Sequence, residues 1–163
     1  MLPPLVSVVG VFVNPEPRDI EAVVEDLPVD LLQFHGDEPP ELCAGAGRPY
    51  VKAVHVRTRD DIVEAADRYS DARALLLDAR HDTLWGGTGS QFDWSVVPDD
   101  VGRPIVLAGG LTPENVAAAI RRVRPFAVDV SGGVESAPGE KDARSMERFM
   151  KEVASAESGE RQG

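Results

Sequence analysis

The sequence repeats one local pattern six times: a short apolar segment rich in β-branched residues is followed by an amphipathic segment with helical spacing. Segments that alternate in this way predict parallel strands joined by right-handed helical crossovers. An open doubly wound sheet and a closed (β/α)8 barrel both satisfy the pattern. The predicted strands are Val6–Val13, Leu31–His35, Tyr50–Val56, Ala74–Asp78, Pro104–Leu107 and the first part of Phe126–Glu135.

The amphipathic segments begin at residues that favour helix starts. Pro17 opens the first, and Thr58 is a predicted N-cap further along. Other helices are expected at Pro39–Ala46, Asp93–Val97, Thr112–Arg122 and Lys141–Ala156. The apolar faces are predicted to include Ile20, Val23, Val24 and Leu27 in the first helix, Ile62, Val63, Ala66 and Tyr69 after Thr58, and Met146, Phe149, Met150 and Val153 in the last.

Two successive predicted strands end in glycine pairs, Ala108-Gly109-Gly110 and Ser131-Gly132-Gly133. Glycine leaves backbone N–H groups free to face an anion, although one such pair alone is commonly a plain turn. Two in succession predict a shared phosphate cradle, and in barrels phosphate often binds after strands seven and eight. We therefore expect an incomplete TIM (β/α)8 barrel of six units, strands 3 to 8, as a single domain over residues 1–157 with a polar tail at 158–163.

Polar residues stand where the predicted strands end, and in barrels that rim holds the active site. Asp78 follows three leucines, and a carboxyl that is partly desolvated there keeps its proton more readily, which suits a general acid. A helix cap or an ion pair with Arg73 or Arg80 is the structural alternative. Asp129 interrupts an apolar strand, so it either points into a site or is paired in the core. The full set is Gln33, His35, His55, Asp78 and Asp129.

The histidines and the cysteine have plainer interpretations. His35 could hydrogen-bond a substrate, but a lone histidine at a strand end is more often structural. His55 and His81 have no companion at metal-ligand spacing, so no metal site is expected. Cys43 is interpreted as a small buried hydrophobe in a helix. The glycine-rich loop Leu84–Gly89 lacks the Gly-Lys-Ser/Thr ending of a P-loop and suits a lid over the barrel mouth.

Composition excludes several classes of partner. The formal charge of −11 argues against nucleic acid, because phosphate backbones recruit Lys and Arg. No apolar run is long enough to span a bilayer, and the start of the chain does not resemble a signal peptide, so no membrane partner is expected. A single cysteine permits no internal disulfide and favours a cytoplasmic location.

Six short motifs follow one another along nearly the whole chain. They are Val9–Asn14, Leu32–Glu38, Leu76–Asp78, Gly86–Gly89 with Phe92–Trp94, Ala108–Leu111 with Pro113–Val116, and Asp129–Glu135. In this order they resemble the phosphoribosylanthranilate isomerases of tryptophan biosynthesis, which rearrange an aminoaldose into an aminoketose. Each motif is weak alone, but six in the right order form a specific signal.

The resemblance implies a (β/α)8 barrel that carries out an Amadori rearrangement on a small phosphorylated substrate, without a cofactor. It implies that Asp78 is the general acid that protonates the furanose ring oxygen, and that Gln33, His35 and Asp129 line the substrate pocket. It also implies that phosphate is held by backbone N–H groups of Gly109, Gly110, Ser131, Gly132 and Gly133.

The sequence departs from the family in two motifs. The general-base cysteine of a Lys-x-Cys-Gly motif and an arginine that contacts the anthranilate carboxylate have no counterpart, and Cys43 matches a helix residue away from the site. We therefore expect an N-terminally truncated chain with two open sheet edges that favour aggregation or a partner strand. Homo-oligomer formation is left open.

Two other functions are alternatives for a chain with these glycine loops. Another phosphosugar barrel, from the histidine pathway or an indole-glycerol-phosphate synthase, would share the glycine loops. The Leu-Leu-Asp strand and the following Gly-Gly-Thr-Gly loop count against both. A barrel fragment that binds phosphate but turns nothing over is the alternative without catalysis.

Overall fold

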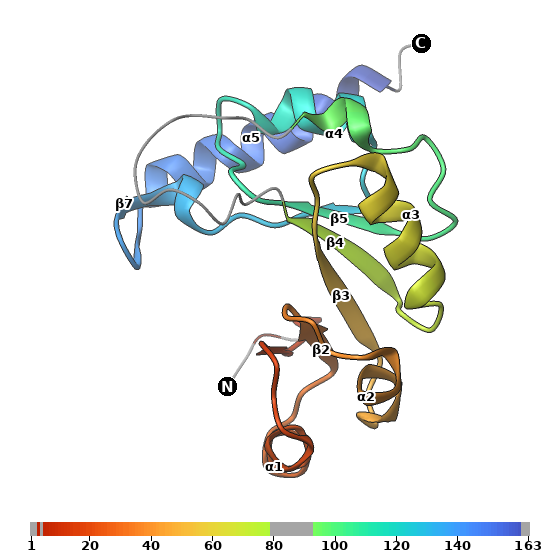
Figure 1. The fold of residues 1–163 in the computed structure, drawn as a ribbon. Coiled ribbons are helices and arrows are strands. Elements are labelled where there is room, and N and C mark those ends of the chain that lie inside the picture. Colours follow the sequence, from red (N-terminus) through yellow and green to blue (C-terminus); the bar gives the residue numbers. More distant parts are fainter. Residues whose placement is uncertain (1–2, 4, 79–92, 161–163) are drawn as a thin grey trace.

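Six parallel strands form one curved sheet (Figure 1). The structure is a computed structural model that describes residues 3, 5–78 and 93–160, with 157–160 described by their backbone alone. The strands pair in chain order, from Val9 opposite Leu31 at one edge to Leu107 opposite Val128 at the other. They are β1 (Val9–Phe12), β2 (Leu31–Phe34), β3 (Tyr50–His55), β4 (Ala74–Asp78), β5 (Ile105–Ala108) and β6 (Ala127–Val128).

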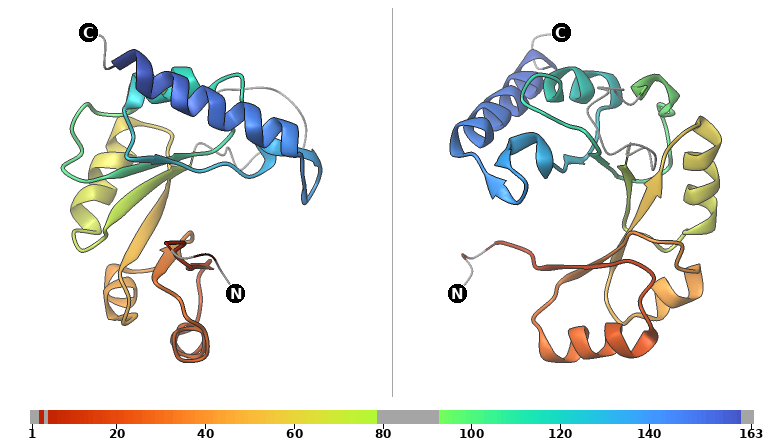
Figure 2. Two further views of the ribbon diagram at one scale, coloured as in Figure 1. Left: turned by 180° about the vertical axis from the view of Figure 1, so that it is seen from behind. Right: turned by 60° about the vertical axis from the view of Figure 1, so that its left-hand side comes forward.

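The helices lie on the outer side of the arc that the strands make (Figure 2). A doubly wound sheet would reverse its strand order at a switch point and carry helices on both faces. The sequential strand order and the one-sided helices therefore favour the barrel architecture over the open sheet. The helices are α1 (Pro17–Asp26), α2 (Pro40–Gly45), α3 (Arg59–Arg68), α4 (Val116–Val123) and α5 (Ala143–Glu160), with 3-10 turns η1 (Trp94–Val96) and η2 (Gly132–Val134).

Local sequence explains where these helices begin. The Thr58 hydroxyl accepts a hydrogen bond from the Asp61 N–H, and the Asp61 carboxylate accepts one from the Thr58 N–H, so the predicted N-cap is confirmed as a capping box. Pro17 stands at the first position of α1, as predicted. Among the described residues, no helix is long and apolar enough to cross a membrane.

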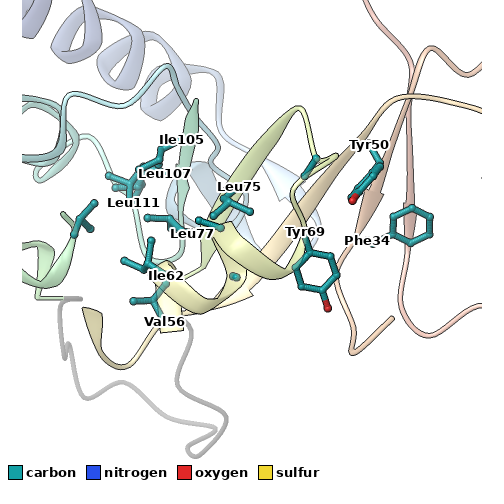
Figure 3. Packing of buried hydrophobic residues seen from close by; sticks show 14 of the residues in the cluster. Phe34, Tyr50, Val56, Ile62, Tyr69, Leu75, Leu77, Ile105, Leu107 and Leu111 are labelled. Atoms are coloured by element: carbon teal, nitrogen blue, oxygen red, sulfur yellow. The ribbon is translucent and has the colours of Figure 1, made fainter. Parts of the chain in front are cut away.

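The main core fills the space between the sheet and the helices (Figure 3). Side chains alternate across each strand, so the larger ones on one parity face the helices. Phe34, Leu75, Leu77 and Leu107 are fully buried there. Full burial of each such side chain contributes about 1.5–3 kcal/mol. The opposite parity carries a smaller inner cluster of Val51, Ala53, Ala74, Leu76 and Ala108.

Several predicted elements differ from the structure at their ends. The strand expected at Val6–Val13 shortens to β1, and β6 has two residues. The segment after η2 forms an unpredicted antiparallel hairpin, β7 (Glu135–Ala137) with β8 (Glu140–Lys141). The last helix begins at Ala143 rather than Lys141 and runs through the start of the expected tail, to Glu160.

Some side chains expected inside are exposed. An apolar, β-branched run such as Val6–Val13 predicts a strand buried on both faces. That prediction is wrong for this edge, because Val6, Val9, Val11 and Val13 are 41–66% exposed. Among the described residues nothing pairs with the outer edge of β1. Periodicity also overestimates the width of the helical apolar faces, because Leu27, Val63, Met146 and Met150 are exposed as well.

A buried ion pair lies on the outer side of β2 and β3. The Lys52 ammonium is 3.4 Å from the Glu38 carboxylate, with side chains 3% and 0% exposed. Burial alone would raise the pKa of Glu38, but hydrogen bonds from the backbone N–H groups of Asn14 and Gly36 and the charge of Lys52 outweigh it and hold the pKa below its ordinary value. The Glu38 carboxyl is thus ionised at neutral pH.

The two glycine loops touch each other. A Cβ atom built on Gly133 would lie 1.8 Å from the carbonyl oxygen of Leu111, whereas one on Gly132 would meet nothing within 4 Å. The loop after β6 therefore approaches the loop after β5 as closely as backbone permits, and only glycine fits at position 133.

This contact predicts a contrast between neighbouring substitutions. We expect Gly133→Ala to lower the free energy of unfolding by about 1–3 kcal/mol through overpacking, whereas Gly132→Ala changes it by less than about 1 kcal/mol. Urea denaturation followed by circular dichroism measures both. Equal stability of the two variants would contradict the close approach.

The ion pair predicts a pH-dependent stability difference. Removing one partner of a buried pair costs about 3–5 kcal/mol, so Glu38→Gln should be clearly less stable than the parent protein at pH 7. Because the pKa of folded Glu38 is below the ordinary value of 4.5, its contribution is complete above that pH and is lost as pH falls through the folded pKa. Denaturation curves at several pH values should converge in acid. A constant difference would exclude this role of the carboxylate.

Candidate active site

Three polar side chains meet at the carboxyl ends of β2 and β4. The His35 Nε2 is 3.1 Å from Asp78 Oδ2, and its Nδ1 is 3.2 Å from Gln33 Nε2. The amide nitrogen of Gln33 can only donate, so Nδ1 accepts and Nε2 carries the proton that is donated to Asp78. The arrangement therefore selects one histidine tautomer and aims its N–H at the carboxyl group.

Strand periodicity places these groups on one face. Gln33 and His35 alternate with the core residues of β2, and the pairing of β3 with β4 sets His55 opposite Asp78. The His55 ring centroid is 5.7 Å from that of His35. Asp78 is 7% exposed and the His35 side chain 24%, so the carboxyl is largely shielded while the imidazole reaches the open inner side.

The loop after β5 is shaped by left-handed glycines. Gly109 and Gly110 have φ angles of 76° and 67°, which favour glycine. The Asn115 side chain accepts from the Thr112 N–H at 2.8 Å and donates to the Gly110 carbonyl oxygen at 2.9 Å. These bonds join the glycine loop to the start of α4.

The loop after β6 is anchored by a lysine. Lys141 donates to the Ser131 carbonyl oxygen at 2.9 Å and to the Ser131 hydroxyl at 3.3 Å, and it pairs with Glu135 at 2.6 Å. Gly133 meets Leu111 of the other loop. The structure thus brings the two predicted glycine loops together.

Asp129 lies apart from the histidine–aspartate contact. It is exposed just after β6, which is separated from β4 by β5, and its N–H donates to the Leu107 carbonyl oxygen at 2.8 Å. Its exposure is not compatible with an ion pair in the core. Its place in a substrate pocket stays a prediction.

The remaining candidates are placed as follows. Cys43 is fully buried in α2, and burial raises the pKa of its thiol to about 11, which makes it a poor nucleophile at neutral pH. Over the described parts of the chain, no group of three or more His, Cys, Asp or Glu could hold a metal ion. The predicted lid Leu84–Gly89 and His81 lie outside the described residues.

Sequence reasoning missed Lys52 and Glu38. A signal was available, because Lys52 interrupts the apolar strand Tyr50–His55 in the way that Asp129 interrupts its own strand. A charge inside such a strand must be paired or reach a site. Lys141 was missed because it follows the hairpin turn that strand patterns did not predict.

The chain is similar to phosphoribosylanthranilate isomerases in sequence. The family model N-(5'phosphoribosyl)anthranilate (PRA) isomerase matches residues 3–152. An N-(5'-phosphoribosyl)anthranilate isomerase of Pseudomonas putida is 54% identical over 95% of this chain and 75% of that protein. One of Acidithiobacillus ferrooxidans is 53% identical over 93% and 74%. These matches do not bear out the expectation that the chain is N-terminally truncated.

Solved structures give the same relationship, because the six-stranded parallel half-barrel of this chain superposes on them. Phosphoribosyl anthranilate isomerase from Thermotoga maritima superposes with a TM-score of 0.84 at 45% identity, covering 94% of this chain and 76% of that one. A second such isomerase, solved in complex with reduced 1-(o-carboxyphenylamino)-1-deoxyribulose 5-phosphate, gives a TM-score of 0.80 at 43% identity, with coverages of 94% and 74%. The chain therefore belongs to the N-(5'-phosphoribosyl)anthranilate isomerase family.

Proposed function

We propose that this chain catalyses the Amadori rearrangement of N-(5-phosphoribosyl)anthranilate to 1-(2-carboxyphenylamino)-1-deoxyribulose 5-phosphate in tryptophan biosynthesis, with Asp78 as the general acid. The observation that carries the assignment is the shielded Asp78 carboxyl, hydrogen-bonded to His35 at the carboxyl end of β4. Family membership supports the reaction, and a relative has been solved with the reduced product bound.

The first step needs a proton at the sugar ring oxygen. Asp78 donates it as the bond between C1 and the ring oxygen breaks, and the anthranilate nitrogen becomes a protonated Schiff base. His35 holds the carboxyl group through its Nε2–H and is itself held by Gln33. In this role His35 and Gln33 line the pocket and orient the acid, while Asp129 contacts substrate from the end of β6.

The second step transfers the proton on C2 to a general base and leaves a neutral enol amine, which tautomerises to the ketone. Cys43 does not supply this base. Its thiol is buried in α2 on the outer layer, and burial raises its pKa to about 11.

The phosphate is proposed to bind where the two glycine loops meet. Gly109, Gly110, Ser131, Gly132 and Gly133 would present backbone N–H groups to it. The left-handed φ angles of Gly109 and Gly110 and the contact of Gly133 with Leu111 support one cradle made by both loops. We also propose that β1 to β6 correspond to strands three to eight of the family's barrel, since this places the cradle after the last two.

Assembly and location are extensions of the same proposal. One solved relative is described as monomers generated from a dimeric enzyme of Thermotoga maritima. We propose a homo-oligomer on that basis, and a cytoplasmic location in keeping with a single, reduced cysteine.

The general-acid role predicts a loss of turnover without a loss of binding. Asp78→Asn preserves the side-chain volume and an acceptor for His35 but cannot donate the proton, so we expect kcat to fall about 10²- to 10⁴-fold. Affinity for the reduced product analogue, measured by calorimetry, should stay within a few-fold of the parent protein. Asp67→Asn, an exposed carboxylate of α3, is the control. Turnover retained in Asp78→Asn would remove the assignment.

The phosphate site predicts an electrostatic effect at position 132, where a side chain has room. We expect Gly132→Asp to weaken binding of inorganic phosphate and of the product analogue by at least about 1 kcal/mol, roughly fivefold, through charge repulsion. Gly132→Asn, equal in size but neutral, should bind more tightly than the aspartate, and Gly45→Asp on α2 controls for net charge. Equal affinities of Gly132→Asp and Gly132→Asn would place the phosphate elsewhere.

A further inference from the structure

We propose that Lys52 and Glu38 are positioning residues that hold His35 in place against Asp78 from the opposite face of the sheet. The proposal rests on the roles given above to Asp78 and His35. Lys52 belongs to β3 and Glu38 to the turn before α2, and both lie in the layer between sheet and helices. The catalytic face and the ion pair are thus on opposite sides of the backbone that carries His35.

Lys52 holds the carbonyl groups of the two residues that precede and follow His35. Its ammonium donates to the Phe34 carbonyl oxygen at 3.2 Å and to the Gly36 carbonyl oxygen at 2.6 Å. A third hydrogen bond goes to the Ala53 carbonyl oxygen at 2.9 Å, which ties the group to β3. The three donors of a lysine ammonium are therefore all engaged, two of them by carbonyl groups that flank the catalytic candidate.

Glu38 holds the same segment by accepting hydrogen bonds from backbone N–H groups. Its carboxylate accepts from Gly36 N–H at 3.0 Å and from Asn14 N–H at 2.8 Å, which brings in the loop after β1. The His35 N–H donates to the Phe12 carbonyl oxygen at 2.8 Å. The backbone from Phe34 to Gly36 is thereby fixed by two opposite charges and by the neighbouring strand.

The loop after β1 and the turn after β2 pack closely against each other beside His35. A Cβ on Gly36 would lie 2.4 Å from the Asn14 side-chain oxygen, and that same oxygen accepts the Asp37 N–H at 2.7 Å. The Tyr69 hydroxyl donates to the Glu38 carbonyl oxygen at 2.9 Å, and its ring centroid is 5.3 Å from the Lys52 nitrogen. A small change at the pair must therefore move His35.

Stability alone does not account for this arrangement. Replacing a buried ion pair by apolar residues of similar size is often neutral or stabilising, because desolvation cancels the attraction between the charges. Here Lys52 and Glu38 hydrogen-bond to backbone groups around His35, which apolar residues of the same size could not do. Displacement of a reacting group by about 1 Å can cost roughly 100-fold in rate, so precise placement of His35 has a kinetic value.

The test compares Lys52→Met with Lys151→Met, which removes an exposed lysine paired to Glu147 on α5. In protein labelled with 15N-histidine, we expect the ring nitrogen resonances of His35, assigned with His35→Asn, to move in Lys52→Met and not in Lys151→Met. We expect kcat of Lys52→Met to fall about 10- to 100-fold. Affinity for inorganic phosphate should not change, because the glycine loops lie on other strands.

A second variant separates positioning from folding. Lys52→Met/Glu38→Leu leaves no unpaired charge and is expected to fold even if the single variant does not. It should show the same displaced His35 resonances and lowered kcat with native-like circular dichroism. Unchanged His35 resonances in a folded variant would overturn the proposal. If the parent protein shows no turnover, the reaction assignment fails, and the resonances still decide whether the pair positions His35.

Discussion

The alternation of side chains along strands that pair in parallel and in chain order is the constraint on which the rest of the structure depends. One parity gives Phe34, Leu75, Leu77 and Leu107 to the helix layer. The other parity carries the inner cluster of Val51, Ala53, Ala74, Leu76 and Ala108, and at or near the carboxyl ends of β2 and β4 it places Gln33, His35 and Asp78 on one side. A shift of one residue in any register would exchange the two sets, so the hydrophobic core also fixes which polar groups meet.

This dependence explains how much could be predicted. The strand–helix repeats, the parallel sheet and the polar ends of β2 and β4 follow from local periodicity, and the sequence was sufficient for them. The exposure of the edge strand β1 and the β7–β8 hairpin could not be predicted in this way. Val9 and Val11 have the composition of a strand buried on both faces, but exposure depends on what packs beside them, which periodicity does not contain. The β7–β8 hairpin was missed because its short strands are polar and exposed.

The residues of the candidate site could be predicted from the sequence, but the contacts between them could not. Asp78, His35 and the glycine pairs stand out in the sequence, but the two features that join them do not. One is the approach of Gly133 to the Leu111 carbonyl, which makes one structure of two loops. The other is the selection of a single His35 tautomer by Gln33 and Asp78. The contact of Gly133 with Leu111 and that of His35 with Asp78 join residues of different units, and single-sequence patterns carry little information on such contacts.

The outer layer shows why a charge is found where packing alone would favour an apolar side chain. A methionine in place of Lys52 could fill the space beside Tyr69, but it could not hold the carbonyl oxygens of Phe34 and Gly36. A strand end is where the ladder of backbone hydrogen bonds stops, and these carbonyl groups need other partners if the chain is to stay in one conformation. The cost of desolvating Lys52 and Glu38 is therefore offset by order in the turn that carries His35, and the same turn faces Asp78 on the inner side.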